Sequence, residues 1–231
     1  GRYTVAEIQD IVAYCTSIGV EVIPCIQTLA HLDQIFRWPA YIPINDVADI
    51  LMVDEPRTYE FIENMFKTVR KCFTSQYIHI GMDEAHMVGR GKYMDIHGYE
   101  DTFSILKRHL DKVCDIAKKY DFVPLIWSDM FFRPWNDGVY CMMKGRREMP
   151  KGFKDAINPD VIPVYWDYYS DKEEHYTDMF YNHKVFKQKT WFAGGIWGWH
   201  GFTPFNAYSI KNSIPAVESC KKNKIKNIFF T

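Results

Sequence analysis

Two adjacent carboxylates, Asp83 and Glu84, follow a short hydrophobic segment and are the residues best suited to chemistry. Residues 77–80 (Tyr-Ile-His-Ile) are rich in β-forming side chains and too short for a helix, so they predict a buried strand. Gly81 ends this segment, and a glycine-rich loop follows at residues 88–91. Ligand sites in α/β proteins form at the carboxyl ends of strands. The position of the pair therefore predicts a functional site, although most Asp-Glu pairs are only solvated surface.

Helical periodicity alternates with strand-like segments along the chain, which implies parallel pairing and right-handed crossovers. We expect helices over about 4–18, 56–73, 99–120 and 171–186, and a last helix broken at Pro215. Expected strands cover 20–23, 77–80, 122–127, 161–166, 190–199 and 225–231, and residues 139–143 are a candidate short strand. The fold class is α/β, of the (β/α) TIM barrel type. A barrel has eight strands, so the six found here predict a truncated one.

The expected domain organisation is a single, incomplete barrel domain over residues 1–231. A helix with no strand before it opens the chain, which suggests that the first two strands are absent and that the six present are the third to eighth. In this first helix, the expected core face comprises Ile8, Ile11, Val12, Cys15 and Ile18. Residues 37–54 contain two prolines and are expected to be an irregular surface excursion.

The composition is that of an ordinary globular protein, with 47% hydrophobic residues and a formal net charge of −1. So small a charge favours neither nucleic acid nor an acidic membrane as a partner. There is no apolar run near the roughly 20 residues of a membrane span and no signal peptide, so we expect a cytoplasmic protein. The six cysteines lack Cys-x-x-Cys spacing and predict a reduced, buried set.

Aromatic residues make up 16% of the chain, including 7 Trp, and several tryptophans end expected strands. Tryptophan can fill a core, but it also offers a flat apolar face to sugar rings. Trp127, Trp166 and Trp197 end three separate strands and predict a sugar platform. Trp199 and Asp167 are candidates for the same surface, with core packing an equal alternative.

Two motifs resemble those of the family 20 glycoside hydrolases, the β-N-acetylhexosaminidases. Residues 79–84 (His-Ile-Gly-Met-Asp-Glu) resemble the family signature His-x-Gly-Gly-Asp-Glu. Residues 19–24 (Gly-Val-Glu-Val-Ile-Pro), followed by 28–31 (Thr-Leu-Ala-His), resemble its third-strand motif, Gly-Ile-x-Val-x-Pro leading to Thr-Pro-Gly-His. The sequences of these motifs are most similar to those of the hexosaminidase D-like branch. The resemblance extends over nearly the whole chain.

The resemblance implies removal of terminal β-linked N-acetylhexosamine from an oligosaccharide or glycoconjugate. Glu84 matches the general acid/base, Asp83 the carboxylate that holds the acetamide nitrogen, and His31 a histidine in the network around the acid. Trp127 and Trp166 match two walls of the acetamide pocket. The family's acetamide-binding tyrosine has no match here.

The sequence also departs from the family pattern. Met82 replaces the second glycine of the signature, and Leu29-Ala30 replace Pro-Gly before His31. The strand around Trp197 lacks the usual Tyr-x-Asp/Asn. The first two strands and the end of the eighth should carry further sugar-binding residues.

The chemistry itself explains why two neighbouring carboxylates suffice. Most retaining glycosidases need two carboxyl groups about 5–5.5 Å apart, but in the family that this chain resembles the 2-acetamido oxygen of the substrate serves as the nucleophile. The protein then needs an acid and an orienting carboxylate on the same side, whereas strand alternation would aim neighbours apart. A free Glu has a pKa near 4.3. Burial beside aromatics and an ionised Asp83 would raise the pKa of Glu84.

Two alternatives come from other classes of protein. One alternative is a metallohydrolase, because three histidines lie near Asp83 in the sequence, namely His79, His86 and His97. No His-x-x-x-His spacing appears, so we expect neither a metal nor another cofactor. A non-catalytic carbohydrate-binding or scaffold domain would keep the tryptophans and lose the acid. If strand edges are exposed, a second copy of the chain is a candidate cover for them.

Overall fold

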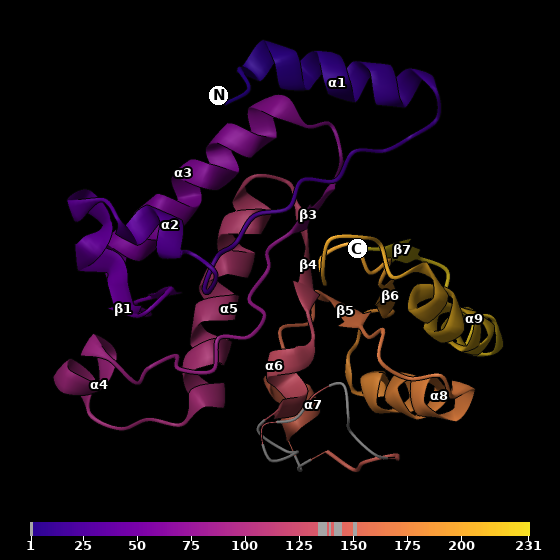
Figure 1. Cartoon of the computed structure of the whole chain (residues 1–231). Helices are drawn as coiled ribbons and strands as arrows, with labels where there is room; N and C mark the ends of the chain where they lie inside the picture. Colours follow the sequence, from indigo (N-terminus) through magenta and orange to yellow (C-terminus); the bar gives the residue numbers. More distant parts are fainter. Residues whose placement is uncertain (1, 134–137, 139, 141–144, 150–151) are drawn as a thin grey trace. The chain divides into compact units, whose positions relative to one another are not determined.

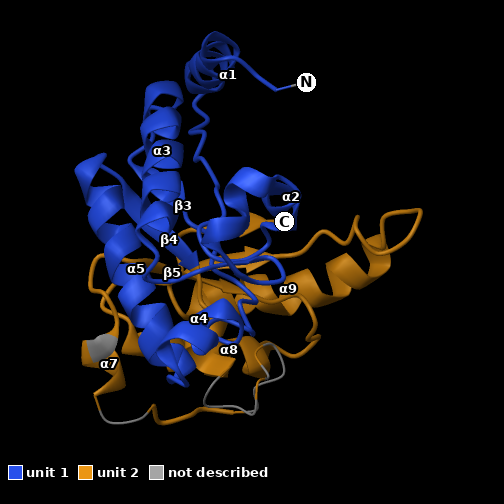
Figure 2. Ribbon diagram, turned by 90° about the vertical axis from the view of Figure 1, so that its left-hand side faces the viewer, with its two compact units in different colours: residues 1–126 blue, residues 127–231 orange. Residues whose placement is uncertain are grey.

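The computed structural model describes residues 2–133, 138, 140, 145–149 and 152–231, which form two compact units (Figures 1 and 2). Unit 1 comprises residues 1–126 and unit 2 residues 127–231. The expected single domain over residues 1–231 stays a prediction. Among the helices in the described part of the chain, none has the length and apolar character needed to cross a membrane.

Unit 1 contains three long helices, several short ones and the first strands (Figure 1). In chain order these are α1 (Val5–Ser17), α2 (Asp33–Phe36), the 3-10 helix η1 (Pro39–Ile44), β1 (Asn45–Val47), β2 (Ile50–Leu51), α3 (Pro56–Cys72), β3 (Tyr77–His79), α4 (Lys92–His97), α5 (Thr102–Lys119) and β4 (Val123–Trp127), the last reaching the unit boundary. The three long helices confirm the helical periodicity of the sequence.

Local capping explains where the long helices begin. Thr4 and Glu7 form a capping box, in which the Thr4 amide donates to Glu7 Oε2 over 2.7 Å. Pro56 occupies the first turn of α3, where its missing N–H costs nothing. Asp101 caps α5 by accepting a hydrogen bond from the Ser104 amide over 2.9 Å.

The strand that precedes the two carboxylates is paired on both sides. β3 runs parallel to β4, with Tyr77 opposite Val123. On its other side, the His79 amide donates to the Pro24 carbonyl over 2.8 Å, and Cys25 forms an isolated parallel bridge with His79. The expected strand at 20–23 is therefore wrong, because pairing with β3 begins only at Pro24.

The helices of unit 1 pack on one another through apolar faces, with one exception. Ile62 and Phe66 of α3 are fully buried, as are most apolar residues on one side of α5. In α1, however, only Val12 is buried, and Ile11 and Ile18 are exposed. The predicted core face is thus confirmed at Val12, with Ile8 and Cys15 half-buried, and wrong at Ile11 and Ile18. The reason is that α1 contacts mainly the end of α3 (Figure 1).

Residues 37–54 were expected to be irregular, but they contain η1, β1 and β2. They also bind the loop that follows the two carboxylates. β1 and β2 form an antiparallel hairpin. The buried Asp46 carboxylate accepts hydrogen bonds from the Gly89 amide (2.8 Å) and the Tyr93 amide (2.9 Å). A Cβ at Gly91 would lie 2.5 Å from the Asp46 carbonyl oxygen, so only glycine allows this close approach.

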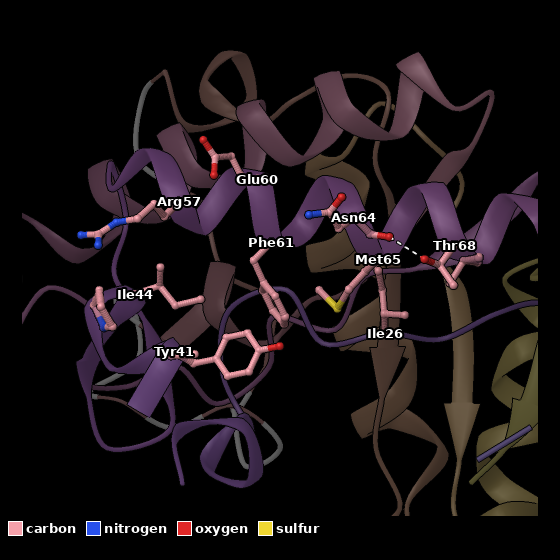
Figure 3. A pocket seen from close by; sticks show the side chains of 12 residues that line it. Ile26, Tyr41, Ile44, Arg57, Glu60, Phe61, Asn64, Met65 and Thr68 are labelled. Carbon is pink, nitrogen blue, oxygen red and sulfur yellow. Dashed lines mark hydrogen bonds between the residues drawn. The ribbon is translucent and has the colours of Figure 1, made fainter. Parts of the chain in front are cut away.

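A pocket of about 590 Å³ lies between η1, α3 and the segment beside β3 (Figure 3). Its apolar side includes Ile26 and the edge-to-face pair Tyr41 and Phe61, whose ring centroids are 5.4 Å apart. One face of α3 adds polar side chains such as Arg57 and Asn64. Neither of the two adjacent carboxylates is among its lining residues.

In its described residues, unit 2 is built on three parallel strands with helices between them (Figure 1). Its elements are α6 (Asp129–Phe132), α7 (Phe153–Ala156), β5 (Ile162–Trp166), α8 (Glu173–Asn182), the 3-10 helix η3 (His183–Val185), β6 (Trp191–Gly194), α9 (Asn206–Lys222) and β7 (Ile228–Phe230). β6 pairs in parallel with β5 on one side and with β7 on the other. The candidate strand at 139–143 lies outside the described residues, apart from Tyr140.

Two elements of unit 2 differ from the sequence expectation, namely the end of β6 and the continuity of α9. β6 ends at Gly194 instead of continuing to Trp199, and a Cβ at Gly195 would lie 2.7 Å from the Tyr168 ring. α9 is continuous through Pro215. Proline removes one backbone hydrogen bond, but the carbonyl that loses its donor belongs to Lys211, an exposed residue that water can reach.

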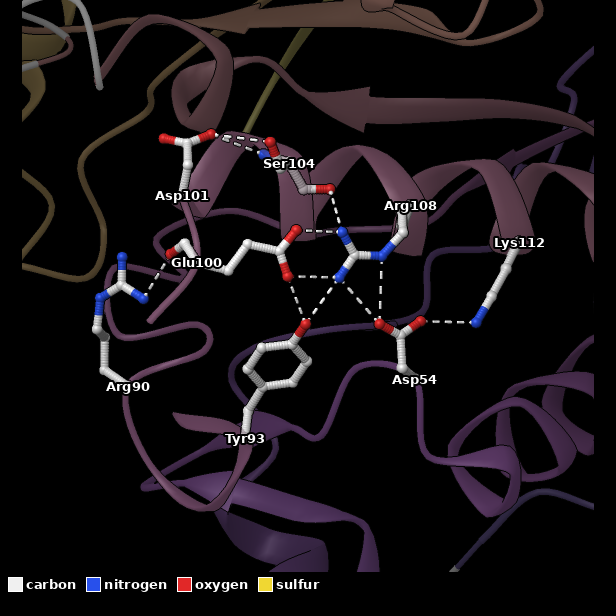
Figure 4. A network of polar contacts seen from close by, with 8 residues as sticks. All are labelled: Asp54, Arg90, Tyr93, Glu100, Asp101, Ser104, Arg108 and Lys112. Carbon is white, nitrogen blue, oxygen red and sulfur yellow. Dashed lines mark hydrogen bonds and ion pairs between the residues drawn. The ribbon is translucent and has the colours of Figure 1, made fainter. Parts of the chain in front are cut away.

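Arg108 on α5 ties together two loops of unit 1 (Figure 4). Its guanidinium donates to Asp54 Oδ2 over 3.0 Å and forms an ion pair with Glu100. The hydrogen bonds that Arg108 and Tyr93 donate to Glu100 hold the pKa of Glu100 below its ordinary value. Burial alone would raise the pKa of Asp54, but hydrogen bonds from Lys112 and Arg108 outweigh it and lower the pKa.

Arg108→Gln is expected to lower the free energy of unfolding near pH 7 but not near pH 3. A carboxylate with a lowered folded-state pKa contributes stability above its unfolded pKa and loses it as the pH falls through the folded value. The difference between wild type and variant should therefore shrink below about pH 4, the ordinary range of carboxylates. Urea unfolding across pH 3–7 measures it.

The matched control is Lys107→Gln, which removes an exposed pair with Asp111 on the same helix. Such a pair contributes only about 0.3–0.5 kcal/mol. A pH-independent loss in Arg108→Gln would contradict the role of the two carboxylates.

Candidate active site

The turn after β3 brings the two adjacent carboxylates to one side of the chain. Gly81, Met82 and Glu84 adopt left-handed backbone conformations, with φ of 70°, 69° and 53°. In an extended strand, neighbouring side chains would point to opposite faces. Here Asp83 Oδ2 lies 3.1 Å, and Glu84 Oε2 3.7 Å, from the same His31 Nε2 atom. The structure thus brings together the three residues that the sequence predicted.

His31 is held at this position through its backbone. It has a φ of 60°, which a non-glycine residue rarely adopts. Its amide donates to Asp49 Oδ2 over 2.7 Å, and its Nδ1 lies 3.7 Å from the same oxygen. Asp49 follows β1, so the hairpin supports the histidine loop.

Two residues of this site were not predicted from the sequence, namely Asp49 and Gln27. The Gln27 side chain donates from Nε2 to Asp83 Oδ1 over 3.1 Å. A polar amide in the mainly apolar segment beside β3 was the available signal for Gln27. Asp49 gave no comparable signal, because it lies in a segment that looked irregular.

The site is partly open to solvent. The Asp83 side chain is 20% exposed and that of Glu84 is 43% exposed. The predicted burial of Glu84 beside aromatic residues is therefore wrong for the described chain. Glu84 is placed to exchange protons with a bound molecule or with water.

Cys25 is a neighbour of the site whose thiol is affected by it. Removal of water from around the thiol raises the pKa of Cys25, and the negative charge on Asp83 raises it further. The five cysteines in the described part of the chain are free, and three of them are buried. Cys25 is exposed and Cys15 half-buried, while Cys141 lies outside the described residues.

The same three residues could hold a metal ion. His31, Asp83 and Glu84 each offer a ligand atom, and these atoms lie within 4.8 Å of one another. Nitrogen and carboxylate oxygens form a donor set suited to a divalent cation such as Zn²⁺. None of the histidines that suggested a metal from the sequence, His79, His86 and His97, belongs to this group. His79 lies in the core. Burial lowers the pKa of His79 to about 3, and its Nδ1 accepts a hydrogen bond from Gly81.

Two predicted aromatic residues end strands as expected. Trp127 is the last residue of β4 and is half-buried, with its ring centroid 6.0 Å from that of Phe229. Trp166 is the last residue of β5, and its Nε1 donates to Asp129 Oδ1 over 3.4 Å. Both residues are half-buried, so part of each remains accessible to solvent. Their role in sugar binding stays a prediction.

Trp197 and Trp199 lie beyond the end of β6 rather than within a strand. Their rings are stacked, with centroids 5.1 Å apart and an interplanar angle of 26°. Tyr168 packs edge-on against both. Trp197 is buried and Trp199 is 49% exposed. Trp197 thus belongs to the packing under Trp199, which offers the larger accessible surface.

Asp167 is fully buried at the end of β5. Its carboxylate accepts hydrogen bonds from the Tyr165 hydroxyl (2.9 Å), the His175 ring (2.7 Å) and the Tyr169 amide (3.0 Å). These three donors satisfy much of its hydrogen-bonding capacity. The arrangement favours support of the strand end, and contact with a substrate stays a prediction.

Comparison with known proteins gives a consistent result. The family model described as "Glycosyl hydrolase family 20, catalytic domain" matches residues 1–218. Hexosaminidase D of Bos taurus is 23% identical over 235 residues, which cover 97% of this chain and 62% of that protein. Hexosaminidase D of Homo sapiens is 24% identical over 184 residues, covering 75% of this chain and 35% of that protein. The chain thus spans less than two thirds of these relatives.

Solved structures show the same fold at low sequence identity. A crystal structure of a β-N-acetylhexosaminidase matches 100% of this chain and 50% of its own, with a TM-score of 0.65 and 16% identity. An exo β-N-acetylglucosaminidase from Vibrio harveyi, in complex with N-acetylglucosamine, matches 84% of this chain and 28% of its own, with a TM-score of 0.58 and 19% identity. The predicted truncated (β/α) TIM-type barrel is confirmed.

His31→Gly is expected to have a free energy of unfolding about 1 kcal/mol higher than that of His31→Ala. An L-residue in the left-handed conformation is strained by roughly 1–2 kcal/mol, and glycine is not. Chemical denaturation of both variants measures the difference. At the exposed Lys67 in α3, the same two substitutions should rank in the opposite order, because alanine is the better helix former. Equal stabilities at position 31 would argue against strain there.

Proposed function

Because the chain belongs to glycosyl hydrolase family 20, we propose that it hydrolyses the bond to a terminal β-linked N-acetylhexosamine. The observation that carries the proposal is the arrangement of Asp83 and Glu84 around His31 at the end of β3. Two carboxylates on one side of a strand end match a reaction in which the substrate supplies its own nucleophile. The substrate class is a glycan or glycoconjugate that ends in GlcNAc or GalNAc.

The proposed reaction retains the anomeric configuration through two displacements. The acetamido oxygen attacks the anomeric carbon while Glu84 donates a proton to the departing glycosidic oxygen. The bond to the leaving group breaks, and a cyclic oxazolinium intermediate forms. Glu84, now ionised, takes a proton from water, which attacks the same carbon and reopens the ring. Each half-reaction inverts the carbon, so the product keeps the original configuration.

Asp83 is assigned to the acetamide N–H. Its charge would orient the group for attack and stabilise the positive charge that develops on the ring. Asp83 suits this role because it is the less exposed of the two carboxylates and has two fixed partners, Gln27 and His31. Glu84 is the more exposed of the two, so its carboxyl group is accessible to a bound glycosidic oxygen and to water.

Sugar binding is assigned to the aromatic residues of unit 2. Trp127, Trp166 and Trp199 keep accessible ring surface, on which the apolar C–H face of a sugar can stack. Trp197 would support Trp199, on which it stacks, and Asp167 would support the end of β5. A second copy of the chain over exposed strand edges, and a cytoplasmic location, also stay proposals.

Glu84→Gln and Asp83→Asn are expected to slow hydrolysis with different dependence on the leaving group. Loss of the proton donor should cost about 10²–10⁴-fold for sugar leaving groups, and less for nitrophenols, which depart without much protonation. Asp83→Asn should slow both substrates to a similar extent, because the nucleophile loses its orienting charge. Release of p-nitrophenol and of free GlcNAc, by this chain and by any longer form that contains it, gives the two rates.

Substrates without the acetamido group separate this mechanism from an ordinary acid and nucleophile pair. Plain β-glucosides should be inert, and a thiazoline mimic of the cyclic intermediate should bind tightly. Equal hydrolysis of β-glucosides would overturn substrate assistance. Binding of the thiazoline without any turnover would favour the non-catalytic carbohydrate-binding alternative.

Hydrolysis is expected to be unchanged by EDTA. In the proposed mechanism Glu84 must carry a proton, and a metal held by His31, Asp83 and Glu84 would occupy the position of the acid. Added Zn²⁺ should therefore inhibit rather than activate. The assay measures rates after chelator treatment, with and without added Zn²⁺. Loss of activity on chelation, with recovery on adding Zn²⁺, would assign the chain to the metallohydrolases instead.

A further inference from the structure

The side-chain amide of Gln27 joins the segment beside β3 to the turn that carries the carboxylates. Its Oε1 accepts a hydrogen bond from the Met82 amide over 3.3 Å. Its Nε2 donates to Asp83 Oδ1 over 3.1 Å. The reverse orientation would set an NH₂ group against an amide N–H and an oxygen against a carboxylate, so the network defines which way the amide points.

The turn is shaped around this amide. Gly81 has a φ of 70°, and a Cβ at this position would overlap Gln27 Oε1. Glycine is thus required here twice, by the backbone conformation and by the approach of the glutamine. Two residues far apart in the sequence fit against one another at this point.

Gln27 also accounts for the methionine that stands where the family signature has a second glycine. Met82 is fully buried and has a φ of 69°. A side chain strains the backbone in this conformation, because its Cβ crowds the following carbonyl oxygen. Its amide donates to Gln27 Oε1, and a buried amide without a partner would destabilise the turn further. The glutamine therefore stabilises a turn that methionine alone would disfavour.

Asp83 is held from both sides. Gln27 binds Oδ1, and His31 binds Oδ2, so the plane of the carboxylate is defined by two partners on the segment that runs beside β3. Each oxygen keeps lone-pair capacity for a further donor. We propose that Gln27 is a positioning residue that fixes the orientation in which Asp83 receives the acetamide N–H of the substrate. This inference rests on the proposed function.

Gln27→Glu tests the inference with almost no change in shape. The new carboxylate still accepts from the Met82 amide, but it replaces the donor to Asp83 with a second negative charge. Two carboxylates this close share a proton at pH values where an isolated one is ionised. The rate of N-acetylglucosaminide hydrolysis should fall about 10–100-fold near pH 6, and the acid limb of its pH profile should move up by about one unit or more.

A second variant separates orientation from stability. Gln27→Met removes both hydrogen bonds and should lower kcat about 10-fold with little change in KM, equally for sugar and nitrophenol leaving groups. Adding Met82→Gly to this variant relieves the backbone and should restore the free energy of unfolding, but not kcat. The matched control is Gln9→Met, which removes one glutamine hydrogen bond to the Lys71 carbonyl and should leave the rate unchanged.

The alkylation of Cys25 by iodoacetamide gives a readout independent of turnover. The charge on Asp83 already raises the pKa of this thiol. In Gln27→Glu a second carboxylate lies beside Asp83, so the alkylation profile of Cys25 should move to higher pH. Peptide mass spectrometry distinguishes Cys25 from the other cysteines.

The outcomes of these experiments distinguish a failure of the proposed function from a failure of the role assigned to Gln27. Absence of hydrolysis by the unmodified protein overturns the proposed function and, with it, the role of Gln27. Hydrolysis with an unchanged pH profile in Gln27→Glu, or recovery of kcat in Gln27→Met with Met82→Gly, overturns the inference alone.

Discussion

The candidate site depends on one backbone constraint, the left-handed turn that follows β3. Adjacent residues of a strand point to opposite faces, so an Asp-Glu pair in a regular strand cannot meet one partner. Gly81, Met82 and Glu84 leave the extended conformation, and His31 can then approach both carboxylates. A turn with two non-glycine residues in this region is strained and persists only where its surroundings determine it.

Those surroundings come from segments far apart in the sequence. Gln27 holds the Met82 amide and the Asp83 carboxylate, and Asp49 holds the backbone of His31. The neighbouring Asp46 fixes the loop that follows Glu84 through two amides, and the Arg108 network ties that loop to α5. Each contact is an ordinary hydrogen bond or ion pair of modest net energy. Together they restrict the turn to few alternative backbone conformations.

The aromatic residues of unit 2 show how the same residue type serves packing and recognition. Trp197 lies under Trp199 and contributes apolar contact area, while Trp199 keeps half of its surface accessible. Asp167, although at a strand end, is occupied by three protein donors. Position at the end of a strand therefore does not by itself decide function, because burial and hydrogen-bond partners determine what a side chain still has to offer.

The sequence by itself determined the alternation of helices and strands, the helix starts at Thr4 and Pro56, and the Asp83-Glu84 pair after a buried strand. These features depend on neighbours in the chain, through caps, periodicity and glycine. Only the tertiary structure decided that β1 and β2 form a hairpin, that Ile11 and Ile18 on the apolar face of the first helix stay exposed, and that β6 ends at Gly194. It also decided the exposure of Glu84 and the roles of Gln27 and Asp49. Burial and hydrogen bonding between distant segments depend on how the chain packs, and no local pattern encodes that geometry.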